Sequence, residues 1–282
     1  MTKGNVVTNG VRLAYEVVGA GDPVLLIAGT GMSKEAWGLF AVSALRDAGH
    51  QVITFDNRGV GESDGPPAPY TVEDMALDAI GLVEALELVG VAVVGLSLGG
   101  SIGQEMARLR PDLVRALVLW AGVGRPPAFF RRLMAVQRQL RASMSLPESW
   151  YRWQTLLISL PFEVLQNDDA TVEQVAELLE GGIIWSGDGA AGQFSAGVEW
   201  DTTEHVDLYR KVMCPCLVVA HEHDLIFPPV SARAAAAAMP DASVIEIPGL
   251  AHGQAPDAAP IVMREILAFL QRATPELGTS NG

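Results

Sequence analysis

An alternation of short apolar runs with longer helix-like segments constrains the fold of this chain more than any other feature of its sequence. Strands are predicted at Val11–Val18, which lies between two turns, at the wholly apolar run Val24–Ala28, and at Gln51–Phe55, Val91–Val94, Val114–Trp120, Cys216–Ala220 and Ser243–Ile247. The segments between them predict helices at Lys34–Ala48, Thr71–Val89, Leu98–Leu109, Val230–Ala238 and Ala258–Arg272. Runs without polar residues are typical of strands buried on both faces, and strand–helix alternation indicates parallel pairing. We therefore predict an α/β fold with a mostly parallel, twisted sheet flanked by helices.

The alternation stops between residues 125 and 205, where helical patterns follow one another. Helices are predicted near Phe129–Arg141, Ser149–Leu160 and Thr171–Glu180. The last has a capping-box pair, Thr171 with Gln174, and a stop at Gly181-Gly182. The glycine-rich stretch Gly181–Gly197 is predicted to be a loop. The expected organisation is a core domain of residues 1–124 and 206–274, an inserted helical lid of residues 125–205, and a flexible tail of residues 275–282.

Composition and charge exclude several classes of function. Apolar residues make up 49% of the 282 residues and charged residues 18%, which is typical of a globular chain. A net charge of −14 argues against binding a phosphate backbone, so no nucleic-acid partner is expected. No apolar run reaches the roughly 18 residues that cross a bilayer, and Met1–Glu16 has no secretory pattern, so we expect a cytoplasmic protein without membrane contact. Cys214 and Cys216 would lie along one strand and are expected to be reduced thiols.

The pentapeptide Gly95-Leu96-Ser97-Leu98-Gly99 has the Gly-x-Ser-x-Gly pattern of a nucleophile elbow. It lies between a predicted buried strand and a predicted helix. Such a turn needs a strained backbone with small neighbours, and it lifts the serine hydroxyl above the sheet beside a helix N-terminus. In a chain with 29 glycines the same pattern can be an ordinary tight turn, but the flanking elements favour Ser97 as a catalytic nucleophile.

A serine hydroxyl needs a neighbouring base to accept its proton, and that base needs an acid to orient it. Of the five histidines, His252 follows the last predicted strand in a loop of small residues. Asp224 comes shortly after the strand Cys216–Ala220. Because ligands gather at the carboxyl ends of parallel strands, we predict that Ser97, Asp224 and His252 meet as a catalytic triad. The alternatives are a turn-capping role for Asp224 and a solvated loop position for His252.

These motifs resemble the α/β-hydrolase superfamily over most of the chain outside residues 125–205. The segment Asp56-Asn57-Arg58-Gly59-Val60-Gly61-Glu62-Ser63 matches the family's D-x-R-G-x-G-x-S turn, and the order Ser97, Asp224, His252 is the family's order. The first half also resembles 3-oxoadipate enol-lactonases and related small-ester hydrolases, notably at Tyr70-Thr71-Val72-Glu73-Asp74. The resemblance implies the α/β-hydrolase fold with an inserted lid and a serine esterase activity; no cofactor or metal ion is expected.

The resemblance also implies an oxyanion hole made of two backbone N–H groups. We assign these to Leu98, the residue after the nucleophile, and to Thr30, with Met32 as the fallback if the loop is shifted. The chain departs from the family here, because Ala28-Gly29-Thr30-Gly31-Met32 stands where the family often has His-Gly. A second departure is His221, where many relatives have glycine before the acid. We expect His221 to pack at the strand end; the alternative is that its ring reaches toward the site.

Residues 125–205 hold four of the six tryptophans. Aromatic residues at helical spacing are most often core, but a lid over the nucleophile would turn some toward the substrate. The candidates for the substrate pocket are Met32, Trp150, Trp153 and Trp185. Basic residues on one predicted helix are expected to be solvated, or alternatively to hold a substrate carboxylate or CoA phosphates; they are Arg131, Arg132, Arg138 and Arg141.

The leading functional hypothesis is hydrolysis of a carboxylic ester, lactone or thioester of a largely apolar small molecule, through an acyl-enzyme on Ser97. The same triad can serve C–C bond chemistry, acyl transfer or a lyase reaction, because one fold hosts many reactions. Two further alternatives are a metal-dependent hydrolase at His221-Glu222-His223-Asp224, for which no second ligand cluster is evident, and a non-catalytic small-molecule receptor. A monomer or homodimer is expected.

Overall fold

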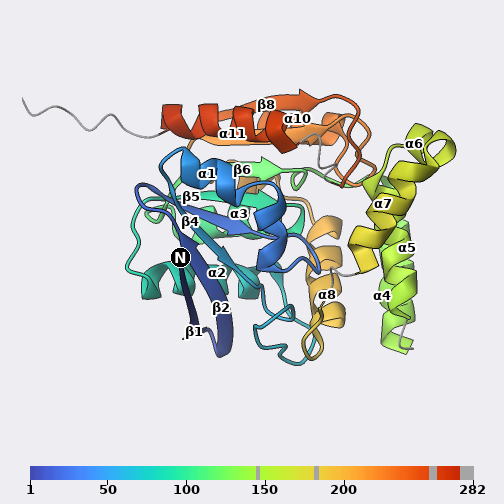
Figure 1. Ribbon diagram of the computed structural model, residues 1–282, viewed down its shortest axis with the longest axis horizontal. Helices are drawn as coiled ribbons and strands as arrows, with labels where there is room; N and C mark the ends of the chain where they lie inside the picture. Colours follow the sequence, from blue (N-terminus) through green and yellow to red (C-terminus); the bar gives the residue numbers. More distant parts are fainter. Residues whose placement is uncertain (144–146, 181–183, 254–258, 274–282) are drawn as a thin grey trace, which may run out of the picture.

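The computed structural model describes residues 1–143, 147–180, 184–253 and 259–273 (Figure 1). Within these residues, eight strands form one sheet in the order β1-β2-β4-β3-β5-β6-β7-β8. The strands are β1 (Thr2–Thr8), β2 (Val11–Val18), β3 (Pro23–Ile27), β4 (Gln51–Phe55), β5 (Val91–Leu96), β6 (Val114–Trp120), β7 (Cys216–His221) and β8 (Ala242–Ile247). The pairs β1–β2 and β2–β4 are antiparallel, and all the other neighbours are parallel. The predicted fold class is confirmed.

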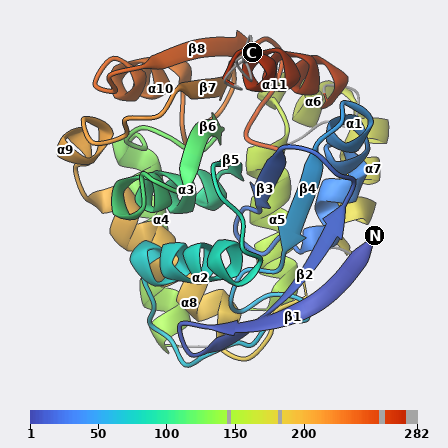
Figure 2. The same cartoon turned by 90° about the vertical axis from the view of Figure 1, so that its left-hand side faces the viewer.

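Helices cover both faces of this sheet (Figures 1 and 2). They are α1 (Val42–Asp47), α2 (Val72–Ala85), α3 (Leu98–Leu109), α9 (Val206–Tyr209), α10 (Pro229–Ala236) and α11 (Ala259–Ala273), with a short 3-10 helix η1 (Lys34–Leu39). Successive side chains of a strand point to opposite faces. Leu25 and Val93 therefore pack with α2, α3 and α10, whereas Leu26 and Val94 pack with η1, α1 and α11. A sheet covered on both faces explains why the central strands β3 and β5 are apolar throughout.

Helix α2 begins as its sequence predicts. The Thr71 hydroxyl accepts from the backbone N–H of Asp74, and the Asp74 carboxylate accepts from the backbone N–H of Thr71. This capping box satisfies two backbone donors at the helix start. The apolar residues that follow at helical spacing, Met75 and Ala79 among them, are buried against the sheet.

The predicted single helix Lys34–Ala48 is wrong, because the structure divides it into η1 and α1. Phe40 lies between the two helices. Its ring packs on Trp37 and Trp120, with centroids 5.2 and 5.7 Å away. The helix is therefore interrupted where Phe40 packs with Trp37 and Trp120.

The predicted loop Gly181–Gly197 is wrong from residue 189 onward, where helix α8 (Gly189–Thr202) begins; residues 184–188 are irregular as predicted, and residues 181–183 lie outside the described residues. Its glycines serve close packing. A Cβ atom on Gly189 would lie 1.8 Å from the carbonyl oxygen of Gly59, and one on Gly192 would lie 1.9 Å from the Tyr70 ring. Small residues let the α8 backbone approach the turn at Gly59 more closely than any side chain would allow.

The other helices inserted between β6 and β7 are α4 (Ala128–Ser143), α5 (Glu148–Ser159), α6 (Phe162–Asn167) and α7 (Asp169–Glu180). The predicted capping box at Thr171 is wrong, since Thr171 lies inside α7 and donates to the carboxylate of Asp168, which precedes the helix. Three elements were not predicted. Strand β1 lies at the edge of the sheet, and helices α6 and α9 are short, so none of them shows a clear periodic pattern of apolar residues. The predicted stop at Gly181-Gly182 and the tail 275–282 lie outside the described residues.

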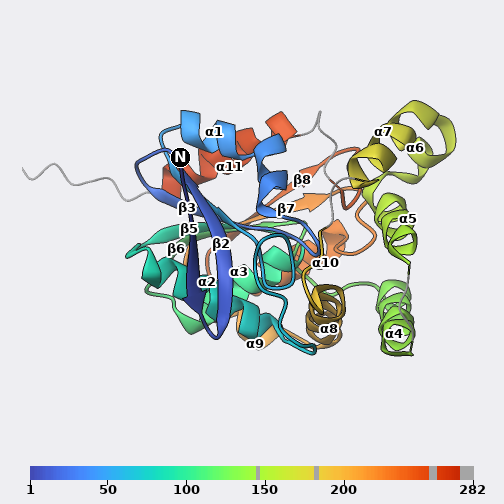
Figure 3. The same ribbon diagram turned by 60° about the horizontal axis from the view of Figure 1, so that its bottom comes forward.

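The inserted helices stand beyond the carboxyl ends of the parallel strands. Helices α4 to α7 form the outer group, and α8 lies between them and the sheet (Figures 1 and 3). In the part of the chain that the structure describes, no helix has both the length and the apolar character needed to cross a membrane. Cys214 and Cys216 are free thiols, as predicted.

Candidate active site

Ser97 occupies a sharp turn between β5 and α3. Its backbone angles are φ 52° and ψ −119°, a left-handed conformation that is strained for any residue with a side chain. A Cβ atom on Gly95 would lie 2.2 Å from the Gly99 carbonyl oxygen, and one on Gly99 would lie 2.0 Å from the Ile27 oxygen. The glycines of the pentapeptide are therefore required by the close approach of three backbone segments. This geometry is that of a nucleophile elbow.

The structure brings Ser97, Asp224 and His252 together in one hydrogen-bonded series. His252 Nε2 lies 2.9 Å from Ser97 Oγ, and His252 Nδ1 lies 2.9 Å from Asp224 Oδ2. The three residues follow β5, β7 and β8, whose carboxyl ends meet at this edge of the sheet. With Nδ1–H donating to the carboxylate, Nε2 is left to accept the proton of the serine hydroxyl.

Asp224 is buried, yet its carboxylate is well satisfied. Its Oδ1 accepts from the backbone N–H groups of Ile226 and Phe227, at 2.7 and 2.9 Å. Burial by itself would raise the pKa of Asp224, but the charge of His252 and the donated hydrogen bonds outweigh it and hold this pKa below its ordinary value. The carboxyl group is therefore ionised at neutral pH.

His221 packs at the end of β7, as expected, and its ring orients the loop of His252. The fully buried ring donates from Nδ1 to the Ala251 carbonyl oxygen at 2.6 Å and accepts at Nε2 from the Trp120 indole N–H at 3.0 Å. Both ring nitrogens are thus engaged. The backbone N–H of His252 donates in addition to the Ile158 carbonyl oxygen on α5, at 3.0 Å, so the loop is held from both sides.

We expect His221 to make folding stability depend on pH. Burial lowers the pKa of His221, whereas the unfolded chain takes up a proton near the ordinary value of about 6.5. Below that value the unfolded state binds more protons, so the free energy of unfolding falls by up to about 1.4 kcal/mol per pH unit until the folded-state pKa is reached. His221→Gln, which keeps a donor and an acceptor, should reduce the difference in unfolding free energy between pH 7.5 and 5.5.

Urea unfolding monitored by circular dichroism at both pH values measures this difference. His205 contributes with the same sign, because burial lowers its pKa as well, and Asp201 with the opposite sign, because burial raises its pKa to about 7; the variant should therefore remove only the His221 part of the pH dependence. His223 is the matched control, since its side chain is about half exposed at 49%. If His223→Gln changed the pH dependence of the unfolding free energy as much as His221→Gln does, the dependence could not be attributed to the burial of His221.

The loop after β3 places backbone donors beside Ser97. Met32 N–H donates to the Gly29 oxygen at 3.2 Å, and Gly31 N–H donates to Gln193 Oε1 at 2.9 Å. Among the described residues, the N–H groups of Thr30 and Leu98 have no hydrogen-bond acceptor. Thr30 and Leu98 both line the cavity that holds Ser97. The structure therefore leaves free the two donors named from the sequence, while the N–H of the fallback, Met32, closes a turn.

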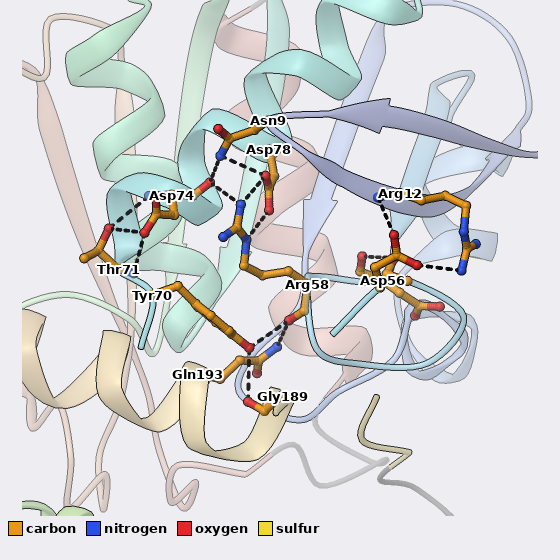
Figure 4. A network of polar contacts seen from close by, with 12 residues as sticks. Asn9, Arg12, Asp56, Arg58, Tyr70, Thr71, Asp74, Asp78, Gly189 and Gln193 are labelled. Carbon is orange, nitrogen blue, oxygen red and sulfur yellow. Dashed lines mark hydrogen bonds and ion pairs between the residues drawn. The ribbon is translucent and has the colours of Figure 1, made fainter. Parts of the chain in front are cut away.

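Gln193 on α8 is a site residue that sequence reasoning missed. It is fully buried, and besides accepting from Gly31 it donates from Nε2 to the Arg58 carbonyl oxygen at 2.9 Å (Figure 4). Arg58 is itself fixed by a buried ion pair with Asp78, in which Nε lies 2.6 Å from Oδ2. No local signal marked Gln193, because Gly189 and Gly192 before it contact Gly59 and Tyr70, which are distant in sequence.

An apolar cavity of about 610 Å³ opens onto Ser97 and His252. Its wall comes from the loops after β3, β7 and β8, from η1, from the Ser97 turn and the start of α3, and from α4, α5, α7 and α8. Of the pocket residues proposed from the sequence, Met32, Trp150 and Trp153 line it; Trp185 does not, and its ring instead packs edge-on against Tyr151 at 5.6 Å.

No Lys or Arg among the described residues lines this cavity. Arg131, Arg132 and Arg138 belong to α4 but not to the cavity wall, and the side chain of Arg141 lies outside the described residues. The metal site suggested at His221-Glu222-His223-Asp224 is not supported by the structure, because both ring nitrogens of His221 already have hydrogen-bond partners. Over the described ranges, no group of three His, Cys, Asp or Glu side chains is placed to hold a metal ion.

Comparison with known proteins identifies the family. The sequence model described as "Alpha/beta hydrolase family" matches residues 24–262. The chain belongs to the α/β-hydrolase family of enzymes. This finding confirms the superfamily inferred from the sequence motifs.

Individual relatives of this α/β-hydrolase have several named activities. It is 32% identical over 243 residues to "Putative non-heme bromoperoxidase BpoC" of Mycobacterium tuberculosis H37Rv, covering 86% of this chain and 91% of that protein. The crystal structure of BpoC has a TM-score of 0.83 at 31% identity, over 93% and 96% of the two chains. "Rhodomycin D methylesterase DauP" of Streptomyces sp. strain C5 is 29% identical, over 92% and 93%.

An enol-lactonase from Burkholderia xenovorans LB400 has a TM-score of 0.79 at 22% identity, over 95% of this chain and 100% of that one. At this identity the likeness concerns the fold alone. The enol-lactonase therefore carries no argument about the substrate of this α/β-hydrolase.

Proposed function

We propose that this α/β-hydrolase cleaves a carboxylic ester, lactone or thioester of a largely apolar small molecule through an acyl-enzyme on Ser97. One observation carries the proposal: the series Asp224–His252–Ser97, with both contacts at 2.9 Å, ends at an apolar cavity. A methylesterase among the relatives supports ester chemistry.

The proposed reaction passes through two tetrahedral intermediates. Ser97 Oγ attacks the carbonyl carbon while its proton moves to His252 Nε2, and Asp224 stabilises the imidazolium that forms. The intermediate collapses with cleavage of the C–O or C–S bond, and the leaving alkoxide or thiolate takes the proton from His252 and departs as the alcohol or thiol. Water then gives a proton to His252 and attacks the acyl group, and the second collapse releases the acid and restores Ser97.

The oxyanion of both intermediates would accept hydrogen bonds from the N–H groups of Thr30 and Leu98. These donors lie in backbone that is already fixed, one in the loop after β3 and one at the start of α3. Donors that need no rearrangement stabilise the developing charge more than they stabilise the bound substrate, which is what lowers the barrier.

We infer further that residues 125–205 act as the lid of this site. Helix α8 would be its fixed part, because Gly189, Gly192 and Gln193 are packed against the core. Helix α5 would link the position of the lid to the catalytic histidine, since the Ile158 carbonyl oxygen accepts a hydrogen bond from the backbone N–H of His252. A lid of this kind would shield the site from bulk water while the ester is positioned for attack by Ser97, and would admit the water that hydrolyses the acyl-enzyme.

The direct test is an activity screen combined with covalent labelling of Ser97. We expect turnover in a panel of p-nitrophenyl esters of increasing acyl length, lactones and acyl thioesters, and its loss when a fluorophosphonate probe modifies Ser97. Rapid-quench mass spectrometry should show the mass of an acyl group on the peptide that contains Ser97. A true substrate that turns over without such an adduct would instead favour C–C bond or lyase chemistry. Failure of Ser97 to react with the probe would favour a non-catalytic receptor.

Gln193 should act as a positioning residue for the oxyanion hole. Gln193→Met removes the acceptor of the Gly31 N–H and so frees the loop that contains Thr30. We expect kcat to fall about 10- to 100-fold with little change in KM, because oxyanion contacts are made mainly in the transition state. Steady-state kinetics on any ester found in the screen measures both constants.

The matched variant is Gln193→Glu, which keeps an oxygen to accept from Gly31. It should retain more of kcat than Gln193→Met, although the lost or altered contact with Arg58 lowers the stability of both variants. If the two variants lost kcat equally, or if only KM rose, the assigned positioning role would be wrong.

A further inference from the structure

One face of α8 forms part of the cavity wall. The residues of this face are Gln193, Phe194, Gly197, Val198 and Asp201, and all of them line the cavity. Their spacing of three to four residues is that of a single helix face. Gln193 at one end is engaged with the core. The other end of the face presents a carboxylate.

Asp201 is chemically exceptional among the described residues that line this cavity. It is the single Asp or Glu of the wall, and no Lys or Arg is present to pair with it. Within the described parts of the chain its side chain makes no hydrogen bond or ion pair. Asp201 is half-buried in this apolar wall. A partly buried carboxylate without a partner is unfavourable, and its natural partner is a cation or a strong hydrogen-bond donor.

The position of Asp201 on its helix strengthens this argument. It lies in the last turn of α8, where the partial negative charge of the helix end disfavours a carboxylate and favours a cation. Burial raises the pKa of Asp201 to about 7, against the opposing effect of a charge on His252. A bound cation would restore the ionised form.

The helix also leaves space beside this carboxyl group. Side chains of an α-helix tilt toward its N-terminus, so the Asp201 side chain leans over the turn that contains Gly197. Gly197 has no side chain, and a Cβ atom built there would meet nothing within 4 Å. The cavity therefore continues over Gly197, next to Asp201.

We propose that the cavity surface at Gly197 and Asp201 is a subsite for a protonated amino group of the substrate. The inference rests on the proposed ester hydrolysis at Ser97 and narrows its substrate class to esters whose otherwise apolar acyl or alcohol part bears an amine. The ammonium group donates a charge-assisted hydrogen bond to the Asp201 carboxylate. The absence of Lys and Arg from the described wall, together with the net charge of −14, makes anionic acyl groups and CoA esters poor substrates.

The test compares esters of equal shape that differ in charge. One pair is 2-(dimethylamino)ethyl butyrate and 3-methylbutyl butyrate, with the amine on the alcohol side. The other pair is the p-nitrophenyl esters of 4-(dimethylamino)butanoic and 5-methylhexanoic acids, with the amine on the acyl side. We expect the charged member of at least one pair to have a kcat/KM about tenfold or more above that of its neutral isostere.

The substitution Asp201→Asn should lower this charged-to-neutral ratio by about tenfold, since it removes the charge at nearly constant shape. Glu199→Gln is the matched control, because Glu199 lies on the same helix but is exposed and does not line the cavity, and it should leave the ratio unchanged. A wild-type ratio at or below one in both pairs, or an equal ratio in the Asp201→Asn variant, would overturn the proposal.

A binding measurement separates this inference from the proposed reaction. Hexyldimethylammonium chloride contains the amine and an apolar chain but no ester. Isothermal titration calorimetry measures its Kd for the Ser97→Ala variant and for the double variant Ser97→Ala/Asp201→Asn. We expect the Kd for the Ser97→Ala variant to be about tenfold lower. Equal Kd values for the two variants would overturn the proposed amine subsite. If the Kd values differ as expected but the wild type hydrolyses no ester, the proposed ester hydrolysis is wrong and the amine subsite is supported.

Discussion

Replacing Ser97 with alanine is expected to lower kcat by a factor on the order of 10³ to 10⁶, with KM little changed. The substitution removes only the hydroxyl oxygen that lies 2.9 Å from His252 Nε2. The free N–H groups of Thr30 and Leu98 and the apolar cavity remain, so ester binding persists while no acyl-enzyme can form. Residual activity would then come from the oxyanion donors alone.

Active-site titration and steady-state kinetics on the best ester of the screen measure this loss. Ser101→Ala is a suitable comparison, since Ser101 also lines the cavity and lies one turn further along the chain, on α3, and among the described residues its hydroxyl makes no hydrogen bond to His252. We expect its kcat to stay within about tenfold of the wild type. A Ser97→Ala variant that retains more than a tenth of the wild-type kcat, with esterase contamination excluded by a second purification, would show that Ser97 is not the nucleophile.

The residues Ser97, Asp224 and His252 could be named from the sequence because each follows a strand with a strong local pattern. Parallel strands bring their carboxyl ends to one edge, so placing the strands correctly also places these side chains together. The elbow of Ser97 adds a second local signal, because its glycines are required by backbone contacts within a few residues and with the neighbouring strand β3.

Helix α8 could not be predicted in the same way. Its glycines read locally as loop residues, yet Gly189 and Gly192 are there to let two distant segments touch. That reason exists only in the folded chain, since the partners Gly59 and Tyr70 are more than a hundred residues away in sequence. With α8 missed, Gln193 and Asp201 were missed as well.

The inserted helices illustrate a further limit of periodicity. Trp150, Trp153 and Trp185 were equivalent candidates for the pocket, because a helical pattern shows which residues share a face but not what that face meets. In the structure Trp150 and Trp153 stack on one another and border the cavity while staying exposed, whereas Trp185 packs on Tyr151. Only the packing of the helices on one another decides between the two outcomes.

Replacing Asp224 with asparagine is expected to lower kcat by about 10⁴ while leaving the fold intact. The reason lies in the direction of the hydrogen bonds. Oδ1 of Asp224 accepts from the N–H groups of Ile226 and Phe227, so the asparagine must place its oxygen there and its amide nitrogen toward His252. An amide nitrogen donates, and His252 Nδ1 would have to accept.

The histidine would then carry its proton on Nε2 and could no longer accept the proton of Ser97, although every heavy atom keeps its place. Because the pKa of Asp224 is held below its ordinary value, the wild type retains the ionised carboxylate throughout the neutral range, and the difference in kcat should persist from pH 6 to pH 8. Stopped-flow acylation rates and thermal unfolding of both proteins separate chemistry from stability. An Asp224→Asn variant that acylates within tenfold of the wild type would mean that Asp224 caps its loop and does not set the tautomer of His252.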